Sequence, residues 1–271
     1  MKRTSFMLDP STEIRPCLTN RSRSLATNNF LEQYIFMLRL IDSEAAERTG
    51  PRSQSSAAYA ALKADILAGR VSPGEKLKIN DIAAQLEVSP GAIREALSRL
   101  VPEGFVVFRD QYGFTVAPIS IEDLLDLTRV RCDIEEIALR RSVAEGDAAW
   151  EANVLGTAHR LRRTPRVIDD TPNMEWLAQH EQFHRALVNG ADSPRLLALN
   201  AQLYQQLERY RVLAWNVDRS RDVDAEHQGL VDAALDRDAD ALAKLARAHF
   251  DRTASLIVEA SRGSSAVNSA G

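Results

Sequence analysis

The sequence predicts a mainly α-helical protein in which a small unit of short helices and one β-hairpin precedes a larger all-α bundle. Between Ala57 and Pro118, three short helical periodicities lead into the β-branched and aromatic segment FVVFRDQYGFTVAPI. From Ile121 to about Arg262 only helical periodicity occurs, in six segments separated by Gly, Pro and Asp. These two observations indicate two domains, the second an all-α helical bundle.

Composition limits the classes of protein to which this chain can belong. Of its 271 residues, 45% are apolar and 27% are charged, which suits two modest globular domains. A formal net charge of −4 excludes a protein that is basic throughout and coats nucleic acid by charge alone. Cys17 and Cys132, the only cysteines, are too few for a disulfide framework and too far apart for a thiolate metal site.

The sequence has no segment that suits a membrane. The apolar run from Tyr34 to Ile41 is short and is interrupted by Arg39, whereas a spanning helix needs roughly 18 or more apolar residues. The first residues, MKRTSFMLDP, lack the apolar region of a secretory signal. We therefore expect a cytoplasmic protein without a membrane partner.

The chain divides into four predicted segments. Charge supports the division, because residues 57–118 hold seven basic and seven acidic side chains, whereas residues 119–271 hold nineteen and twenty-five. The predicted segments are a flexible N-terminal extension (1–56), a winged helix-turn-helix domain (57–118), an all-α domain (119–262), and a disordered tail (263–271).

The order of elements in residues 57–118 is that of a winged helix-turn-helix. Gly69 ends the first helix, and Ser89 suits the N-cap of the third, with Pro90 as its first residue. The third helix carries an apolar stripe and leaves Arg94 and Arg99 outward, as a helix in the DNA major groove requires. Taken alone, such arginines are more often solvated or ion-paired.

The string AYAALKADILAGRVSPGEKLKINDIAAQLEVSPGAIREALSRLVPEGFVVFRDQYGFTVAPIS closely resembles the N-terminal domain of the GntR family of bacterial regulators. The resemblance implies binding to double-stranded DNA at a palindromic operator, as a homodimer. It implies contacts to DNA from Ser89, Arg94 and Arg99, a wing tip at Tyr112 and Gly113 near the minor groove, and Asn80 and Lys78 near the phosphate backbone.

The start of the third helix departs from that family pattern. Many members have Arg-Thr-Pro after the serine, whereas this chain has Pro90, Gly91 and Ala92, so a side chain that often contacts a base is absent. Specificity must therefore depend more on Arg94, on backbone N–H groups at the start of the helix, and on DNA shape.

Four of the five histidines have a spacing that suits a shared site. His180 and His184 are four residues apart on one predicted helix face. His227 lies about nine residues before a turn at Asp236–Asp238, and His249 about eleven residues after it, so an antiparallel helix pair places them at similar heights. The residues alone leave a metal site and separately satisfied histidines about equally open.

Residues 121–260 resemble the FCD ligand-binding domain of the FadR subfamily of GntR regulators, in VRCDIEEIALRRSVAEG, HEQFHRALV and AEHQGLVDAALDRDADALAKLARAHF. Metal-binding members use one Asp and three His, which correspond here to His180, His184, His227 and His249, with His180 in place of the Asp. An all-imidazole set favours zinc, with nickel, copper or iron as alternatives. It either closes a structural site or leaves positions open for an effector carboxylate.

Arg131 has two possible roles of equal weight. The resemblance places a cation here that pairs with the effector carboxylate, and Glu135, four residues later, offers an ion pair within the same helix.

The resemblance as a whole implies a transcriptional repressor that is controlled by a small organic acid at the metal site. Two alternatives remain, a regulator for which the metal ion is itself the signal, and a metal-dependent hydrolase. The hydrolase is the less favoured alternative, because Glu181 points about 100° away from the helix face of His180. We therefore expect no enzymatic activity.

Overall fold

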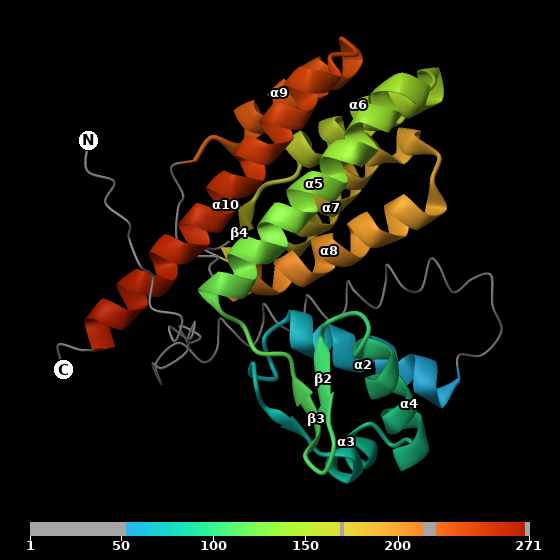
Figure 1. Ribbon diagram of the computed structural model, residues 1–271, viewed down its shortest axis with the longest axis vertical. Coiled ribbons are helices and arrows are strands. Elements are labelled where there is room, and N and C mark those ends of the chain that lie inside the picture. The colour runs from blue at the N-terminus through green and yellow to red at the C-terminus, as the bar shows by residue number, and fades with distance from the viewer. Residues whose placement is uncertain (1–52, 169–170, 214–220, 269–271) are drawn as a thin grey trace.

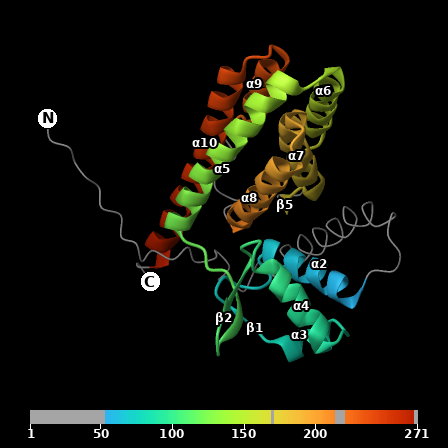
Figure 2. The same ribbon diagram turned by 45° about the vertical axis from the view of Figure 1, so that its right-hand side comes forward.

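The structure is a computed structural model that describes residues 53–168, 171–213 and 221–268. These residues form a small unit of helices and a sheet and a larger unit of long helices, joined by the segment between β3 and α5 (Figure 1). The two units remain distinct after a 45° rotation (Figure 2). Apart from residues 53–56, the predicted N-terminal extension lies outside the described residues.

Three short helices build the smaller unit: α2 (Gln54–Leu67), α3 (Ile79–Gln85) and α4 (Pro90–Leu100). The side chains of Ser53 and Ser89 cap α2 and α4 by accepting a hydrogen bond from the backbone N–H three residues later. Helix α2 begins before Ala57, where the predicted domain starts. Gly69, with φ of 68°, follows its end, as predicted.

The sheet of the smaller unit has three antiparallel strands in the order β1-β3-β2. Strands β2 (Val106–Arg109) and β3 (Gly113–Val116) form the predicted hairpin, with Val107 opposite Thr115. Strand β1 (Lys76–Leu77) was not predicted, because two residues are too few to form an alternating pattern. Together with α2, α3 and α4, this sheet makes the predicted winged helix-turn-helix.

Six α-helices, as predicted, form the larger unit within the described residues: α5 (Ile121–Glu145), α6 (Ala148–Arg163), α7 (Met174–Val188), α8 (Pro194–Leu213), α9 (Val223–Leu235) and α10 (Ala239–Asn268). The 3-10 turn η1 (Asn189–Ala191) follows α7. Helix α10 extends beyond Arg262, where the predicted tail begins.

One expectation for this unit was wrong, namely that it contains no strand. The predicted break between Thr164 and Pro172 holds a minimal antiparallel pair, β4 (Val167–Ile168) and β5 (Thr171–Pro172). Each strand has two residues, so no period-2 pattern could indicate it.

Helix α5 is central to the packing of the larger unit. It lies along α10 in both ribbon views and also packs against α8 and η1, while α6 packs against α7 and α9 (Figure 2). Fully buried apolar side chains from several helices fill the core, among them Leu139, Phe183, Leu230 and Leu242. The bundle thus holds α7, α9 and α10 around a common interior.

Gly190 marks a close approach between η1 and α5, and it gives a stability prediction. A Cβ at Gly190 would lie 2.9 Å from the Ser142 carbonyl oxygen and 3.0 Å from the Ser142 Cα, both backbone atoms that cannot turn away. We expect Gly190→Ala to lower the free energy of unfolding by about 1–3 kcal/mol in urea denaturation. Gly229→Ala is the control, since its Cβ would meet only Leu245 Cδ1, at 3.6 Å. Equal stability of the two variants would contradict this packing.

Helix α8 connects the two units through hydrogen bonds to backbone carbonyls. Gln202 donates to Pro102 (3.0 Å), and Gln206 donates to Glu103 (2.6 Å), both just beyond α4. Arg209, which is buried, donates to the carbonyl of Ala117 at 2.6 Å, at the end of the wing. These three residues lie on one face of α8, at i, i+4 and i+7.

In the described part of the chain, no helix has both the length and the apolarity that a membrane span needs.

Candidate functional site

The exposed face of α4 is the candidate DNA-contacting surface. Its apolar stripe, including Ile93 and Leu97, is fully buried, which turns the opposite face with Arg94 to the solvent. Ser89 Oγ accepts a hydrogen bond from Ala92 N–H (3.2 Å), which fixes the start of the helix. The backbone N–H groups at this end carry the positive end of the helix dipole.

Lys78 and Asn80 lie at the start of α3, and both are exposed. Lys78 lies 3.8 Å from Asp81, and both side chains are about 70% exposed. Such a surface pair contributes little to stability, so phosphate can replace the carboxylate at small cost. Their predicted position beside the DNA backbone is compatible with this exposure.

Arg99 has a contact within the protein that the sequence did not indicate. Its guanidinium lies 4.1 Å from the centre of the Tyr59 ring on α2. The Tyr59 hydroxyl donates to Glu103 at 2.6 Å, and Lys63 pairs with the same carboxylate at 2.7 Å. Arg99 therefore helps to join α4 to α2, and its DNA contact stays a prediction.

The wing tip projects two aromatic side chains. Tyr112 is 70% exposed, and Gly113 has φ of 81°, a conformation that favours glycine. Phe108 is half exposed and packs against Phe114, and the two ring centroids are 4.9 Å apart. The predicted wing residues thus lie at an exposed tip that can reach a groove.

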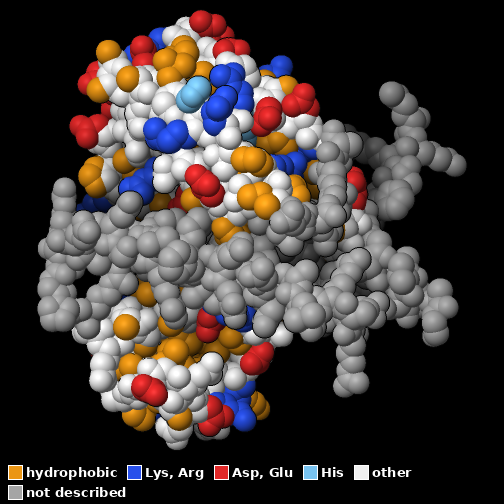
Figure 3. Space-filling view, turned by 180° about the vertical axis from the view of Figure 1, so that it is seen from behind, with side chains coloured by type: hydrophobic (Ala, Val, Ile, Leu, Met, Phe, Trp, Pro, Cys, Tyr) orange, Lys and Arg blue, Asp and Glu red, His pale blue; other side chains and the backbone are white. Residues whose placement is uncertain are grey.

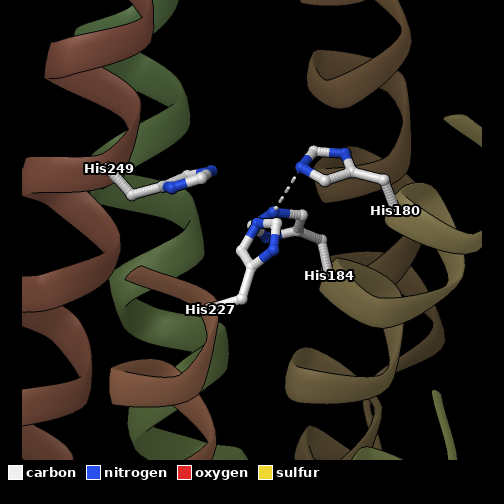
Figure 4. A group of neighbouring side chains, drawn as sticks. All are labelled: His180, His184, His227 and His249. Carbon is white, nitrogen blue, oxygen red and sulfur yellow. Dashed lines mark hydrogen bonds between the residues drawn. The ribbon is translucent and has the colours of Figure 1, made fainter. Parts of the chain in front are cut away.

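The four predicted metal ligands converge inside the helical unit. His180 and His184 come from α7, His227 from α9 and His249 from α10, and the rings point toward one another (Figure 4). One ring nitrogen from each lies within 4.8 Å of the others, and all four side chains are buried. The predicted convergence of these side chains is therefore present in the structure.

The spacing of the rings suits a common ion. The Nε2 atoms of His180 and His184 are 3.2 Å apart. Two imidazole nitrogens that bind zinc tetrahedrally at about 2.0–2.1 Å lie about 3.3 Å from each other. The ring centroids of His227 and His249 are 5.1 Å apart, and each lies 5.0–6.2 Å from those on α7.

Burial keeps all four imidazoles neutral. Desolvation lowers the pKa of His227 to about 2 and that of His249 to about 4, and it places those of His180 and His184 well below the usual value. The neutral ring is the form that binds a metal ion, since it has a free lone pair. Positive neighbours reinforce the effect, first among them Arg211 beside His180.

Several ring nitrogens in the cluster lack a hydrogen-bond partner. These are Nδ1 of His184 and both nitrogens of His227, all of them buried. A buried polar atom without a partner is costly, and a bound ion would satisfy those that face the centre. The donor set therefore fits a divalent transition-metal ion.

Neighbouring side chains hold the outer nitrogens of two rings. Nδ1 of His249 is 2.8 Å from a carboxylate oxygen of Glu226, and Nδ1 of His180 is 3.1 Å from the hydroxyl of Tyr204. A carboxylate on the far nitrogen of a histidine orients the ring and makes it a stronger ligand. Arg221 pairs with Glu226, and this guanidinium holds the pKa of the carboxyl at about 2.

Arg131 is buried in the ion pair that was one of its two predicted roles. Its Nε donates to Glu135 at 3.2 Å, and Asn200 donates to the same carboxylate oxygen. The guanidinium also lies 3.9 Å from the centre of the Phe250 ring. Its Nη2 is buried without a hydrogen-bond partner, so a donor remains for a ligand.

A cavity of about 70 Å³ lies beside the histidine cluster. His180 and His249 line it together with Arg131, and three further arginines line it that the sequence interpretation did not single out. These are Arg166, Arg211 and Arg221. One signal was available for Arg211, which lies seven residues after Tyr204 and so shares its face of α8.

A second cavity, of about 370 Å³, lies between α6 and α9. His227 lines it, together with His159, the histidine outside the cluster, and Arg162. Basic residues end α6, and Lys and Arg side chains gather beside a surface histidine on the helical unit (Figure 3). The second cavity therefore reaches the cluster through His227, whereas the first reaches it through His180 and His249.

A winged helix-turn-helix joined to a helical domain with a buried polar site defines a DNA-binding transcriptional regulator. Residues 54–116 match the bacterial regulatory proteins of the gntR family, and residues 126–252 match the FCD domain. The chain belongs to the GntR family of transcriptional regulators, in the branch that carries an FCD domain. This membership makes it a regulator rather than a hydrolase.

Two curated relatives cover most of their own length. The uncharacterised HTH-type transcriptional regulator BphR of Paraburkholderia xenovorans (strain LB400) is 40% identical over 210 residues, which is 76% of this chain and 86% of the relative. The HTH-type transcriptional repressor GlaR of Escherichia coli (strain K12) is 34% identical over 213 residues, 76% and 96% of the respective chains.

Solved structures share the fold. Escherichia coli McbR/YncC aligns with a TM-score of 0.62 at 19% identity, covering 77% of this chain and 99% of that one. A GntR regulator from Rhodococcus sp. RHA1 aligns with a TM-score of 0.60 at 21% identity over the same shares.

Proposed function

We propose that this regulator is a repressor that binds a palindromic operator as a homodimer and leaves it when a small organic acid binds the helical domain. The observation that carries the proposal is the buried four-histidine cluster beside a cavity lined by arginines. The name of the relative GlaR, a transcriptional repressor, supports repression. We place the protein in the cytoplasm and retain the predicted domain division, with the DNA-binding domain begun at Gln54.

On the DNA side, we propose that α4 enters the major groove and that the wing tip lies near the minor groove. Arg94 is the proposed base contact, because it is exposed on the face opposite the buried stripe. The other proposed contacts are Lys78, Asn80, Ser89, Arg99, Tyr112 and Gly113. One winged domain offers few positive charges, so two copies on a palindrome supply the affinity.

We propose that His180, His184, His227 and His249 hold one divalent metal ion, zinc in preference to nickel, copper or iron. The support is the all-imidazole donor set, its burial and its unpartnered nitrogens. When bound, the ion supplies positive charge, and any open coordination position accepts a carboxylate oxygen. Arg131 would donate to the same carboxylate through Nη2.

Helix α8 supplies the proposed route from effector to DNA-binding domain. One face of α8 carries Tyr204 and Arg211 beside His180, and the other carries the three side chains that hold the winged domain. An acid that shifts Arg211 would move this helix and with it the winged domain. The acid acts only through its different affinities for the two arrangements.

Arg209 tests this route. In Arg209→Met the carbonyl of Ala117 loses its buried donor, so we expect the free energy of unfolding to fall by about 1–3 kcal/mol. We also expect an acid that binds the variant to change its DNA affinity by less than about twofold, since the coupling is lost. Arg195→Met, an exposed position on the same helix, is the control. An undiminished response of the Arg209 variant would contradict the route.

The experiment for the proposed function uses the full chain and a duplex selected from a random-sequence library by the protein itself. Carboxylic acids that bind are first identified because they raise the melting temperature of the protein. Fluorescence anisotropy then measures the affinity of the protein, with one equivalent of zinc, for the duplex in the presence of each of these acids. We expect such an acid to weaken DNA binding by at least about fivefold, the lower end of a typical coupling of 1–3 kcal/mol. Acids that bind without changing DNA affinity would contradict the proposal.

The second candidate is a regulator for which the metal is the signal. It is favoured by the number of imidazoles, since four can complete a tetrahedral site and leave no position for an acid. In that case zinc alone would change DNA affinity, and carboxylic acids would add nothing.

A further inference from the structure

We infer that the effector carries two acidic groups and is a compact dicarboxylate, with its two ends held by different arginines of the 70 Å³ cavity. The inference rests on the proposed function and adds the chemical class of the acid. Four arginines line the cavity, and no acidic side chain is among the described residues that line it. Arg131, Arg211 and Arg221 each also pair with one glutamate outside the cavity lining. With five N–H donors on each guanidinium, they still offer more donors than one carboxylate can accept.

The first anionic position lies at Arg131. Glu135 engages only Nε of this guanidinium, and Nη2 is buried with no partner. The side chain itself is about 3% exposed, so water does not satisfy the remaining donor freely. A carboxylate at this end of the cavity would accept from Nη2 and meet the histidine cluster at the same time.

The second anionic position lies between Arg211 and Arg221. Nη1 of Arg211 is 3.2 Å from Nδ1 of His180, and Nη2 of Arg221 is 3.1 Å from Nδ1 of His249. Both arginines therefore lie at the outer nitrogens of the histidines, away from the Nε2 of His180 that faces His184. The two ends of the ligand are thus bound at separate places.

The tautomers expected of the two histidines leave N–H donors of these arginines without an acceptor on the rings. If Nε2 is the ligating atom, the ring proton lies on Nδ1, and an arginine, which only donates, has no acceptor there. His249 Nδ1–H then donates to Glu226, and His180 Nδ1–H to Tyr204. Arg211 keeps Glu208, and Arg221 keeps Glu226, the hydroxyl of Thr253 and the carbonyl of His249. Because a guanidinium has five N–H donors, each of the two still has one to offer a carboxylate.

The walls and size of the cavity favour a short, unbranched ligand. Apart from the arginines, the two histidines and Thr253, the lining is apolar and includes Trp176, Leu207, Phe250 and Ile257. A volume of about 70 Å³ is far below the ~300–1,000 Å³ of pockets for drug-sized ligands. A few methylene groups between two carboxylates match this pattern, and a long acyl chain does not.

The first test compares acids of equal carbon number on the zinc-loaded full chain by calorimetry. The probes are the straight-chain dicarboxylates of three to six carbons and the matching monocarboxylates, such as succinate and butyrate, with inorganic phosphate as a single-centre anion. We expect one dicarboxylate to bind at least about tenfold more tightly than its monocarboxylate, the effect of a charge-assisted contact.

The second test uses Arg211→Gln and Arg221→Gln, with Arg162→Gln as the control, because Arg162 lines only the second cavity. We expect the dicarboxylate preference to fall below about threefold in the first two variants and to persist in the control. Zinc content and melting temperature without acid identify any variant that has lost its fold or its ion. The comparison of dicarboxylates with monocarboxylates uses the unmodified protein, so it tests the inference even if a variant does not fold.

The outcomes separate this inference from the proposed function. If a monocarboxylate or phosphate binds as tightly as every dicarboxylate and releases DNA, the proposed function stands and the two-ended site is wrong. If none of these probes binds or changes DNA affinity, both are overturned. A dicarboxylate preference that both variants retain also overturns the assignment of Arg211 and Arg221.

Discussion

A His184→Ala variant is expected to lose the metal ion. His184 faces His180 through Nε2 at 3.2 Å, and its ring lies next to those of His227 and His249. Removing this ligand leaves three imidazoles and opens the site. Loss of a residue that only supports a ligand costs up to about a hundredfold in metal affinity, so loss of the ligand itself should lower the zinc affinity by at least that much. Competition with a fluorescent chelator measures this affinity.

The same variant should change how stability depends on metal. A ligand that binds only the folded state raises stability by RT ln(1 + [L]/Kd), so a chelator should lower the melting temperature of the unmodified protein. It should leave that of His184→Ala nearly unchanged. His159→Ala is the matched control, because His159 is exposed and lies outside the cluster. Equal zinc affinity in all three proteins would contradict the proposed site.

Arg94→Gln is expected to weaken binding to the selected duplex by about 5- to 150-fold, which corresponds to 1–3 kcal/mol for a lost base contact. Arg94 is exposed on α4, and a Gln there keeps the helix and a polar side chain but removes the charge and the guanidinium fork. Anisotropy with the selected duplex and with a scrambled duplex measures the effect.

The loss should be larger for the selected duplex than for the scrambled one. If Arg94 contacted only a phosphate, its loss would weaken binding to both duplexes equally and would reduce the slope of the salt dependence by about one. Arg129→Gln is the control, because Arg129 is an exposed arginine of α5 that forms a surface ion pair with Asp126. Unchanged affinity of the Arg94 variant for both duplexes would remove Arg94 from the DNA-contacting surface.

Much of the fold could be predicted because its signals are local. The apolar stripe of α4, the cap at Ser89 and the stop at Gly69 each follow from neighbouring residues, and the structure has all three. Strands β1, β4 and β5 were missed, because two-residue strands depend on distant partners rather than on their own pattern.

The histidine cluster could be predicted from two spacings and one turn. An i, i+4 pair fixes two rings on one face, and similar distances from a turn place His227 and His249 at one height. The family resemblance then assigned the four as one set. The outer partners, Tyr204 and Glu226, had no such signal, because their side chains reach the rings from other helices or other turns.

The arginines of the cavity show the limit of sequence interpretation. Arg211 and Arg221 belong to a chain with 34 basic residues, most of which suit a solvated surface. Only the packing of α7, α8 and α10 brings them to the histidines. For Arg131, the sequence offered an ion pair or a ligand contact, and the buried geometry has the ion pair while leaving one donor for a ligand.

The most direct test of the central claim is a crystal structure of the zinc-loaded protein with anomalous data collected at the zinc edge. We expect one strong peak per chain in the helical domain, about 2.0–2.1 Å from a nitrogen of each of the four histidines. No peak at this position, or a peak bound only by other residues, would contradict the account.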